Sequence, residues 1–199
     1  IHRLRGLAEP TSLHQVCHPD LPQEHPRLRT VEGPEDALPV QLTTFIGRSQ
    51  EVAEIGDLLR EHRIVTLSGA GGAGKTRLAV RVAEQMVADY PDGLRMAELA
   101  AVADTDVLVE EVAQRFAVTP VSGQPLVKTI AESIGAQRML LVLDNCEQIV
   151  EPVAALCSDL LTRCPALHIL ATSRQRLGVA GEVVYRVPSL GLPDGDVTP

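Results

Sequence analysis

Aromatic side chains are scarce in this chain, whose 199 residues include two Phe, two Tyr and no Trp. A hydrophobic core must therefore be built from Leu, Val, Ile and Ala, and the hydrophobic fraction of 45% is sufficient for one. With 22% charged residues, the composition is that of a soluble globular protein, long enough for one ordinary domain and some extra chain.

Other absences exclude whole classes of function. The net charge of −8 argues against a domain whose main task is to bind nucleic acid non-specifically, though not against a small basic site. No apolar run approaches the ~20 residues of a membrane span, and no signal peptide is visible. The four cysteines show no zinc-like spacing, and His14, Cys17 and His18 match no standard metal site. We therefore expect a cytoplasmic protein.

The first 44 residues differ from the rest. Six prolines exclude long helices there, and two short strands within residues 1–20 are followed by a proline-rich linker at 21–41. The chain begins at Ile1 without Met and ends in "LPDGDVTP" without a closing element. We expect it to be part of a longer protein, with residues 194–199 starting a further region.

Residues 42–193 alternate between apolar strands and amphipathic helices. Strands are predicted at "RIVTLSG", "GLRMAELA", "RMLLVLD", "LHILATS" and "EVVYRVPSL", and helices at 49–62, 75–90, from 104, from 125 and at 147–164. This order predicts an α/β fold of the P-loop NTPase type, a doubly wound, mainly parallel five-stranded sheet flanked by helices. Ligands bind such sheets at the carboxyl ends of the strands.

A glycine-rich turn after the first of these strands predicts a phosphate site. "GAGGAGKT" fits the pattern G-x-x-x-x-G-K-[ST], between a buried strand and a helix. Glycines let backbone N–H groups point at an anion, the lysine reaches the β- and γ-phosphates of a nucleotide, and the threonine hydroxyl binds Mg²⁺. The alternative is a glycine-rich turn with an exposed lysine. The phosphate-binding candidates are Gly69, Ala70, Gly71, Gly72, Ala73, Gly74, Lys75, Thr76 and Arg77.

The third strand ends in Asp144, which we predict to be the second Mg²⁺ contact beside Thr76; the alternative is a helix cap. The next residue is Asn145, which can hold a water but cannot take a proton at neutral pH. Glu147 is either a base that activates water or an acid in the first helical turn. Both readings stay open.

The fourth strand ends in Arg174. An arginine at this edge of the sheet can contact the γ-phosphate and report whether it is present; the alternative is an arginine solvated at the rim.

In sequence order, "TTFIGRSQEVAEI", "RIVTLSGAGGAGKTRLAVRVA", "MLLVLDNCEQI" and "LHILATSRQRLGVAGEVVYRVPSL" resemble the nucleotide-binding domain of STAND-class ATPases, the AAA+-related group that includes NB-ARC proteins. The resemblance extends to large bacterial regulators in which this ATPase precedes helical repeats and a LuxR-type DNA-binding domain. It implies that "FIGR" lies near the adenine, so Phe45 and Arg48 become nucleotide candidates. It also implies that Asn145 is usual at its position, and that the domain is a switch that exchanges or slowly hydrolyses nucleotide.

Residues 1–20 are similar to the last strands of a class III adenylate cyclase domain. The resemblance places the cyclase metal ligands before Ile1, so no cyclase activity is expected. The helical, repeat and DNA-binding domains of such a regulator would follow Pro199, and no helix-turn-helix is visible here. We therefore expect no direct nucleic-acid binding, and nucleotide-dependent oligomers are possible.

Three functions compete at this stage. The first is a regulatory switch that binds ATP or ADP with Mg²⁺ and hydrolyses ATP slowly if at all. The second is an active P-loop ATPase or small-molecule kinase, although no Arg-rich lid segment is visible. The third is an interaction fragment that no longer binds nucleotide.

Overall fold

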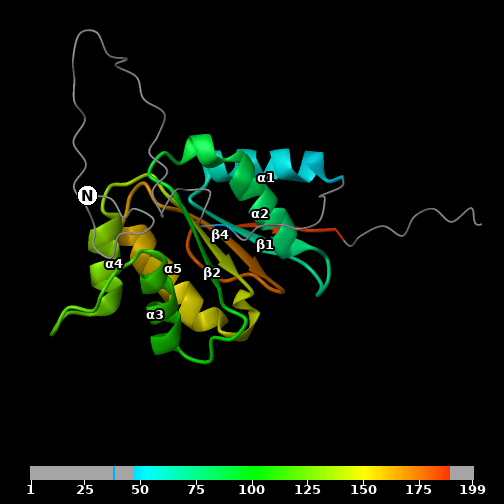
Figure 1. Ribbon diagram of the computed structural model, residues 1–199. Helices are drawn as coiled ribbons and strands as arrows, with labels where there is room; N and C mark the ends of the chain where they lie inside the picture. Colours follow the sequence, from blue (N-terminus) through cyan, green and yellow to red (C-terminus); the bar gives the residue numbers. More distant parts are fainter. Residues whose placement is uncertain (1–37, 39–46, 189–199) are drawn as a thin grey trace, which may run out of the picture.

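The computed structural model describes Leu38 and residues 47–188, and its centre is a sheet of parallel strands in the order β2-β3-β4-β1-β5 (Figure 1). The strands are β1 (Ile64–Ser68), β2 (Leu94–Glu98), β3 (Leu140–Asp144), β4 (His168–Ser173) and β5 (Val183–Arg186). The helices are α1 (Ser49–Glu61), α2 (Lys75–Gln85), α3 (Thr105–Arg115), α4 (Leu126–Ile134) and α5 (Val150–Arg163). Two short 3₁₀ helices are η1 (Val87–Asp89) and η2 (Cys146–Gln148).

Helices cover both faces of the sheet. Figure 1 shows α1 and α2 on one face and α3, α4 and α5 on the other, and each face has its own cluster of buried apolar side chains. Among the described residues, no helix is long and apolar enough to cross a membrane. The predicted doubly wound P-loop NTPase fold is confirmed.

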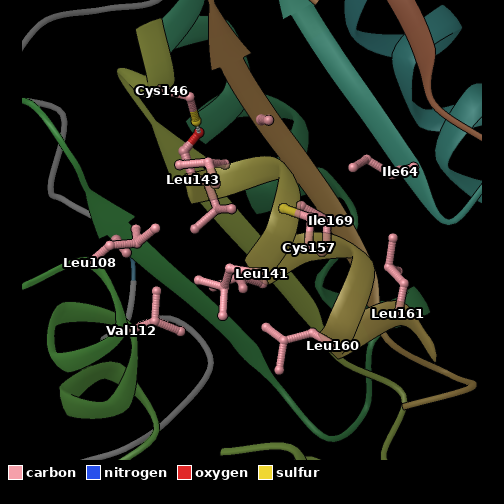
Figure 2. Close-up of a cluster of buried hydrophobic side chains, with 14 of the residues drawn as sticks. Ile64, Leu108, Val112, Leu141, Leu143, Cys146, Cys157, Leu160, Leu161 and Ile169 are labelled. Atoms are coloured by element: carbon pink, nitrogen blue, oxygen red, sulfur yellow. Dashed lines mark hydrogen bonds between the residues drawn. The ribbon is translucent and has the colours of Figure 1, made fainter. Parts of the chain in front are cut away.

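The central strand β3 shows why an unbroken apolar run was needed. Leu141 and Leu143 point into the cluster on the side of α3 and α5 (Figure 2), while Leu140 and Val142 belong to the cluster on the side of α1 and α2. All four are fully buried. Burial of one such side chain stabilises the fold by about 1.5–3 kcal/mol, so truncation of any of them to Ala would be costly.

The strand order decides where the functional residues meet. β4 lies between β1 and β3, with Ser68 in register with Ser173 and Leu143 in register with Ala171. The carboxyl ends of these three neighbours therefore bring the glycine-rich loop, Arg174 and Asp144 to one edge, as parallel sheets of this kind do for their ligands.

Two predicted helix bounds were wrong. The helix expected over 75–90 ends at Gln85, and the chain continues into η1. The helix expected to start at Glu147 begins at Val150, because Asn145 (φ 61°) and Ile149 (φ −134°) are not helical and only η2 lies between them. The predicted cyclase-like segment, Phe45, residues 194–199 and the linker apart from Leu38 lie outside the described residues.

Candidate functional site

The loop between β1 and α2 adopts a conformation that needs its glycines. Gly72 and Gly74 have φ angles of 77° and 78°, in the left-handed region that side chains with a Cβ avoid. At Gly69 a Cβ would lie 3.0 Å from the Val187 carbonyl oxygen, so the close approach of the segment after β5 also favours glycine there. The loop leads into the amino end of α2, whose first turn contains no acidic residue. This helix end is therefore free to favour an anion.

Lys75 is the first residue of α2 and is only 7% exposed. Its Nζ donates to the carbonyl oxygens of Gly69 and Ala70, each at 3.0 Å. A buried ammonium group must be hydrogen-bonded, and here the loop itself supplies the acceptors. The predicted exposed-lysine alternative is therefore not what the structure shows.

Thr76 and Asp144 are in direct contact. The Thr76 hydroxyl oxygen lies 2.9 Å from Oδ1 and 3.0 Å from Oδ2 of Asp144, whose carboxylate is 2% exposed at the end of β3. Neither η2 nor α5 has a side-chain cap, so Asp144 does not cap the helix that follows it. A hydroxyl beside a carboxylate, next to a loop suited to phosphate, matches the hard oxygen ligands that Mg²⁺ prefers.

Two further residues hold this carboxylate. The fully buried Thr172 on β4 donates its hydroxyl proton to Oδ1 of Asp144 and accepts the backbone N–H of Asn145 at 3.0 Å. The Asn145 amide donates to Oδ2 of Asp144 at 3.1 Å. Asn145 has a φ of 61°, a conformation that Asn tolerates better than most residues with a Cβ. Sequence reasoning noted Thr172 only as part of a strand end, since its role depends on the pairing of β3 with β4.

Glu147 and Arg174, which were predicted separately, form an ion pair with 3.2 Å between Oε1 and Nε. Glu147 lies in η2 rather than in the first turn of α5, where Glu151 is the acidic residue, so its expected place in the main helix was wrong. Its second oxygen, Oε2, is buried and has no hydrogen-bond partner within the described part of the chain. The guanidinium group of Arg174 lies beside the loop, because a Cβ on Gly71 would be 3.7 Å from Nη2.

Arg48 is hydrogen-bonded to the glycine-rich loop. Its guanidinium group donates to the carbonyl oxygens of Ala73 at 2.8 Å and Pro188 at 3.0 Å, and thus joins the loop to the segment that follows β5. Arg48 therefore lies against the glycine-rich loop, and its proximity to a nucleotide stays a prediction. Arg77 is exposed in the first turn of α2.

Two pockets lie at opposite edges of the sheet. One, of about 270 Å³, is lined by Glu147, Gln148, Arg174 and Gln175 at the carboxyl edge. A larger one of about 420 Å³ lies at the opposite edge, near Ile64 at the start of β1. Of the two, only the first lies beside the glycine-rich loop, since Arg174 lines it and also lies near Gly71, so we take it as part of the candidate site. Within Leu38 and residues 47–188, no cluster of three His, Cys, Asp or Glu could hold a metal by itself. A metal at Thr76 and Asp144 would therefore also need oxygen atoms from a bound nucleotide as its ligands.

The sequence model of the AAA domain family matches residues 59–179, well over half of the chain. The chain belongs to this family. The match includes the glycine-rich loop, Asp144 and Arg174, and agrees with the parallel sheet and the position of the loop.

Curated relatives of this AAA domain come from mycobacteria. A protein of Mycobacterium tuberculosis (strain ATCC 25618 / H37Rv) named as an HTH-type transcriptional regulator is 42% identical over 137 residues, which is 69% of this chain and 15% of that protein. An uncharacterized protein of the same strain is 38% identical over 151 residues, 76% of this chain and 38% of its own. The chain therefore spans well under half the length of either relative.

Solved structures with the same fold include a Signal Transduction ATPase with Numerous Domains (STAND) from Pyrococcus horikoshii, with a TM-score of 0.51 and 18% identity over 79% of this chain and 25% of that one. Cdc6p from Pyrobaculum aerophilum has a TM-score of 0.51 and 18% identity, over 75% of this chain and 46% of that one. The ORC2 protein of Aeropyrum pernix, solved in ADPNP and ADP complexes, has a TM-score of 0.52 and 12% identity, over 71% and 48%. At these identities the likeness shows the fold.

Proposed function

We propose that this AAA domain is a nucleotide-dependent switch that binds ATP or ADP with Mg²⁺ and hydrolyses ATP slowly. The observation that carries the proposal is the contact between Thr76 and the buried Asp144 carboxylate, beside Lys75 at the amino end of α2. A hydroxyl, a carboxylate and an ammonium group at a helix amino end are the parts that Mg²⁺–nucleotide binding requires.

On binding nucleotide, Lys75 would exchange its present hydrogen-bond acceptors for phosphate oxygens. Its Nζ now donates to two loop carbonyls, and phosphate oxygens would replace these weaker, uncharged acceptors. The backbone N–H groups of the loop and of the first turn of α2 would hold the remaining phosphate oxygens. Arg48 would keep the loop open by its hold on Ala73.

Thr76 and Asp144 would hold the metal, Thr76 directly and Asp144 from the end of β3. Bound there, Mg²⁺ would neutralise phosphate charge. Thr172 and Asn145 would keep the carboxylate in place, because each donates to a different oxygen of Asp144.

Slow hydrolysis is supported by the groups around the place of attack. Asn145 cannot accept a proton from water, and its backbone conformation and amide contact serve to position Asp144. Glu147 is the carboxylate available as a base in the adjoining pocket, and its Oε1 is occupied by Arg174. Arg174 in turn lies beside Gly71, where it would meet the third phosphate.

We propose further that the parent protein is a signalling or transcriptional regulator. The relative bears the name "Putative HTH-type transcriptional regulator" and this chain spans 15% of it, so DNA binding and other domains would lie outside the matched part of such a protein. Nucleotide-dependent association with other copies would be one way for such a switch to pass on its state.

Isothermal titration of the 199-residue chain with ADP and with ATP, in the presence of Mg²⁺, tests the proposal. We expect Lys75→Ala to abolish most of the binding heat, whereas Lys128→Ala, which changes an exposed lysine on α4, should leave it unchanged. Equal heats for Lys75→Ala and the unmodified chain would remove the phosphate site.

An active ATPase or small-molecule kinase is the alternative. Steady turnover by the full-length protein at the roughly 1–100 per second of active kinases would favour it over a switch. Binding with turnover far below that range would favour the switch.

A further inference from the structure

Glu147 and Arg174 form an ion pair at the site, and neither residue belongs to the glycine-rich loop. Glu147 is 17% exposed and Arg174 is 67% exposed, with 3.2 Å between Oε1 and Nε. The exposed arginine side chain therefore has room to turn, whereas the glutamate is enclosed by its surroundings. Moving the arginine would cost little desolvation, whereas the carboxylate would stay where η2 places it.

Arg174 stands between two places for negative charge. On one side its Nε contacts Glu147, and on the other its Nη2 lies near Gly71 at the outer end of the phosphate loop. The backbone around it is fixed, because the Ser68 hydroxyl donates to the Arg174 carbonyl at 3.3 Å and the Gln175 N–H donates to Ser173 Oγ at 3.2 Å. Only the side chain would need to turn.

We infer that Glu147 sets the preference of the site between ATP and ADP by competing with the third phosphate for Arg174. The inference rests on the proposed nucleotide site. ADP has no third phosphate and leaves the ion pair intact, so its affinity does not include the cost of breaking the pair. ATP gains the contact with Arg174 only by breaking the bond to Glu147, so its net gain is reduced by the strength of that bond.

The same exchange would change Glu147. When Arg174 turns to the phosphate, Oε1 loses its charged partner, and Oε2 has none in the described part of the chain. The carboxylate would then face the 270 Å³ pocket with both oxygens able to accept protons from water. A base freed only by the third phosphate cannot act before that phosphate has bound.

The test measures affinities for ADP and for an ATP analogue with a non-cleavable β–γ bond, both with Mg²⁺. Glu147→Gln keeps the side-chain shape and removes the charge, so we expect the analogue to bind about two- to fivefold more tightly while ADP affinity stays the same. The factor is modest because Arg174 is largely exposed. Glu151→Gln removes an exposed charge from the first turn of α5 and is the matched control, with no change expected for either nucleotide.

A double-mutant cycle separates competition from simple repulsion. Arg174→Ala should weaken the analogue more than ADP, and in that background Glu147→Gln should have no further effect on the ratio of the two affinities. If Glu147→Gln raises the ratio equally with and without Arg174, the glutamate acts by repelling the phosphate and the competition is refuted. An unchanged ratio in the single variant refutes it as well.

If the proposed nucleotide binding itself is wrong, the experiment gives a different result from a failure of the competition. In that case the unmodified chain would bind neither nucleotide, and the result would be known before any variant is compared. Far-UV circular dichroism and thermal unfolding of each variant establish that it is folded, so a change of ratio cannot come from loss of structure.

Discussion

Replacement of Thr172 by Val gives the sharpest test of how the Asp144 carboxylate, the proposed metal ligand, is held. The side chain is fully buried on β4, donates to Oδ1 of Asp144 and accepts the N–H of Asn145. Val has nearly the same shape, so the packing stays while both hydrogen bonds are lost. Asp144 then keeps the Thr76 hydroxyl and the Asn145 amide as donors.

The expected loss of stability in Thr172→Val follows from those two hydrogen bonds. A hydrogen bond to a charged group contributes about 1.5–3 kcal/mol and a neutral one about 0.5–1.5 kcal/mol. We therefore expect Thr172→Val to lower the free energy of unfolding by about 2–4 kcal/mol, measured by urea denaturation with an unchanged slope. Thr172→Ser retains the hydroxyl and should recover more than half of the loss.

The chain contains a matched control one strand away. Thr66 on β1 is equally buried, but its hydroxyl has no hydrogen-bond partner among the described residues. Thr66→Val makes the same chemical change without breaking a bond, so stability should be unchanged or rise by about 1 kcal/mol. Equal destabilisation by the two substitutions would show that shape rather than hydrogen bonding matters, and the reasoning would be refuted.

The functional effect of Thr172→Val should appear only with metal. A carboxylate that has lost one of its donors is less well placed for Mg²⁺, so the gain in ADP affinity on adding Mg²⁺ should shrink. Affinity for ADP without Mg²⁺ depends on Lys75 and the loop, and it should not change. A loss of both would mean that the substitution damages the phosphate loop itself.

Two further predictions concern backbone strain and thiol reactivity. Asn145→Ala should be less stable to urea than Asn145→Gly by about 1–2 kcal/mol, since both lose the amide contact and only Ala is strained at a φ of 61°; equal stabilities would contradict this. Burial raises the pKa of Cys157 to about 12 and also raises those of Cys146 and Cys164, so in a Cys17→Ser variant a thiol reagent at pH 8 should react only after unfolding; rapid labelling of the folded variant would count against it.

Local sequence was enough to predict the glycine-rich turn between β1 and α2 and the place of Asp144 at the end of β3. All the residues that determine the conformation of the glycine-rich turn lie within the eight residues "GAGGAGKT". In the third strand, an apolar run that stops at a single acidic residue marks the end of a buried strand. The fold could be predicted for a similar reason, because alternating strands and amphipathic helices leave few topologies for a parallel sheet.

The contacts that join distant parts of the chain could not be predicted. Thr172 and Asp144 are 28 residues apart, and their hydrogen bond exists because β3 and β4 are neighbours in the sheet. Arg48 reaches Pro188 across 140 residues for a similar reason, since β5 lies beside β1. The start of α5 was misjudged because Ile149 continues the apolar spacing of Val153 and Leu156. Only the backbone angles of the left-handed Asn145 and the non-helical Ile149 show that the chain turns first.

These contacts give three side chains of the proposed site a common property, because each already has an acceptor within the protein. Lys75 has two carbonyl oxygens, Thr76 has Asp144, and Arg174 has Glu147. A contact of any of these three side chains with phosphate or metal would therefore be an exchange, and its net free energy would be the difference between the new contact and the old one. Neutral carbonyls are weak competitors, so Lys75 contributes much to the affinity for any nucleotide. Glu147 is a charged competitor for a largely exposed Arg174, so it would reduce the net gain of ATP over ADP by about the same two- to fivefold factor. With a smaller difference between the two affinities, a small bias from another part of the protein would be able to decide which nucleotide is held.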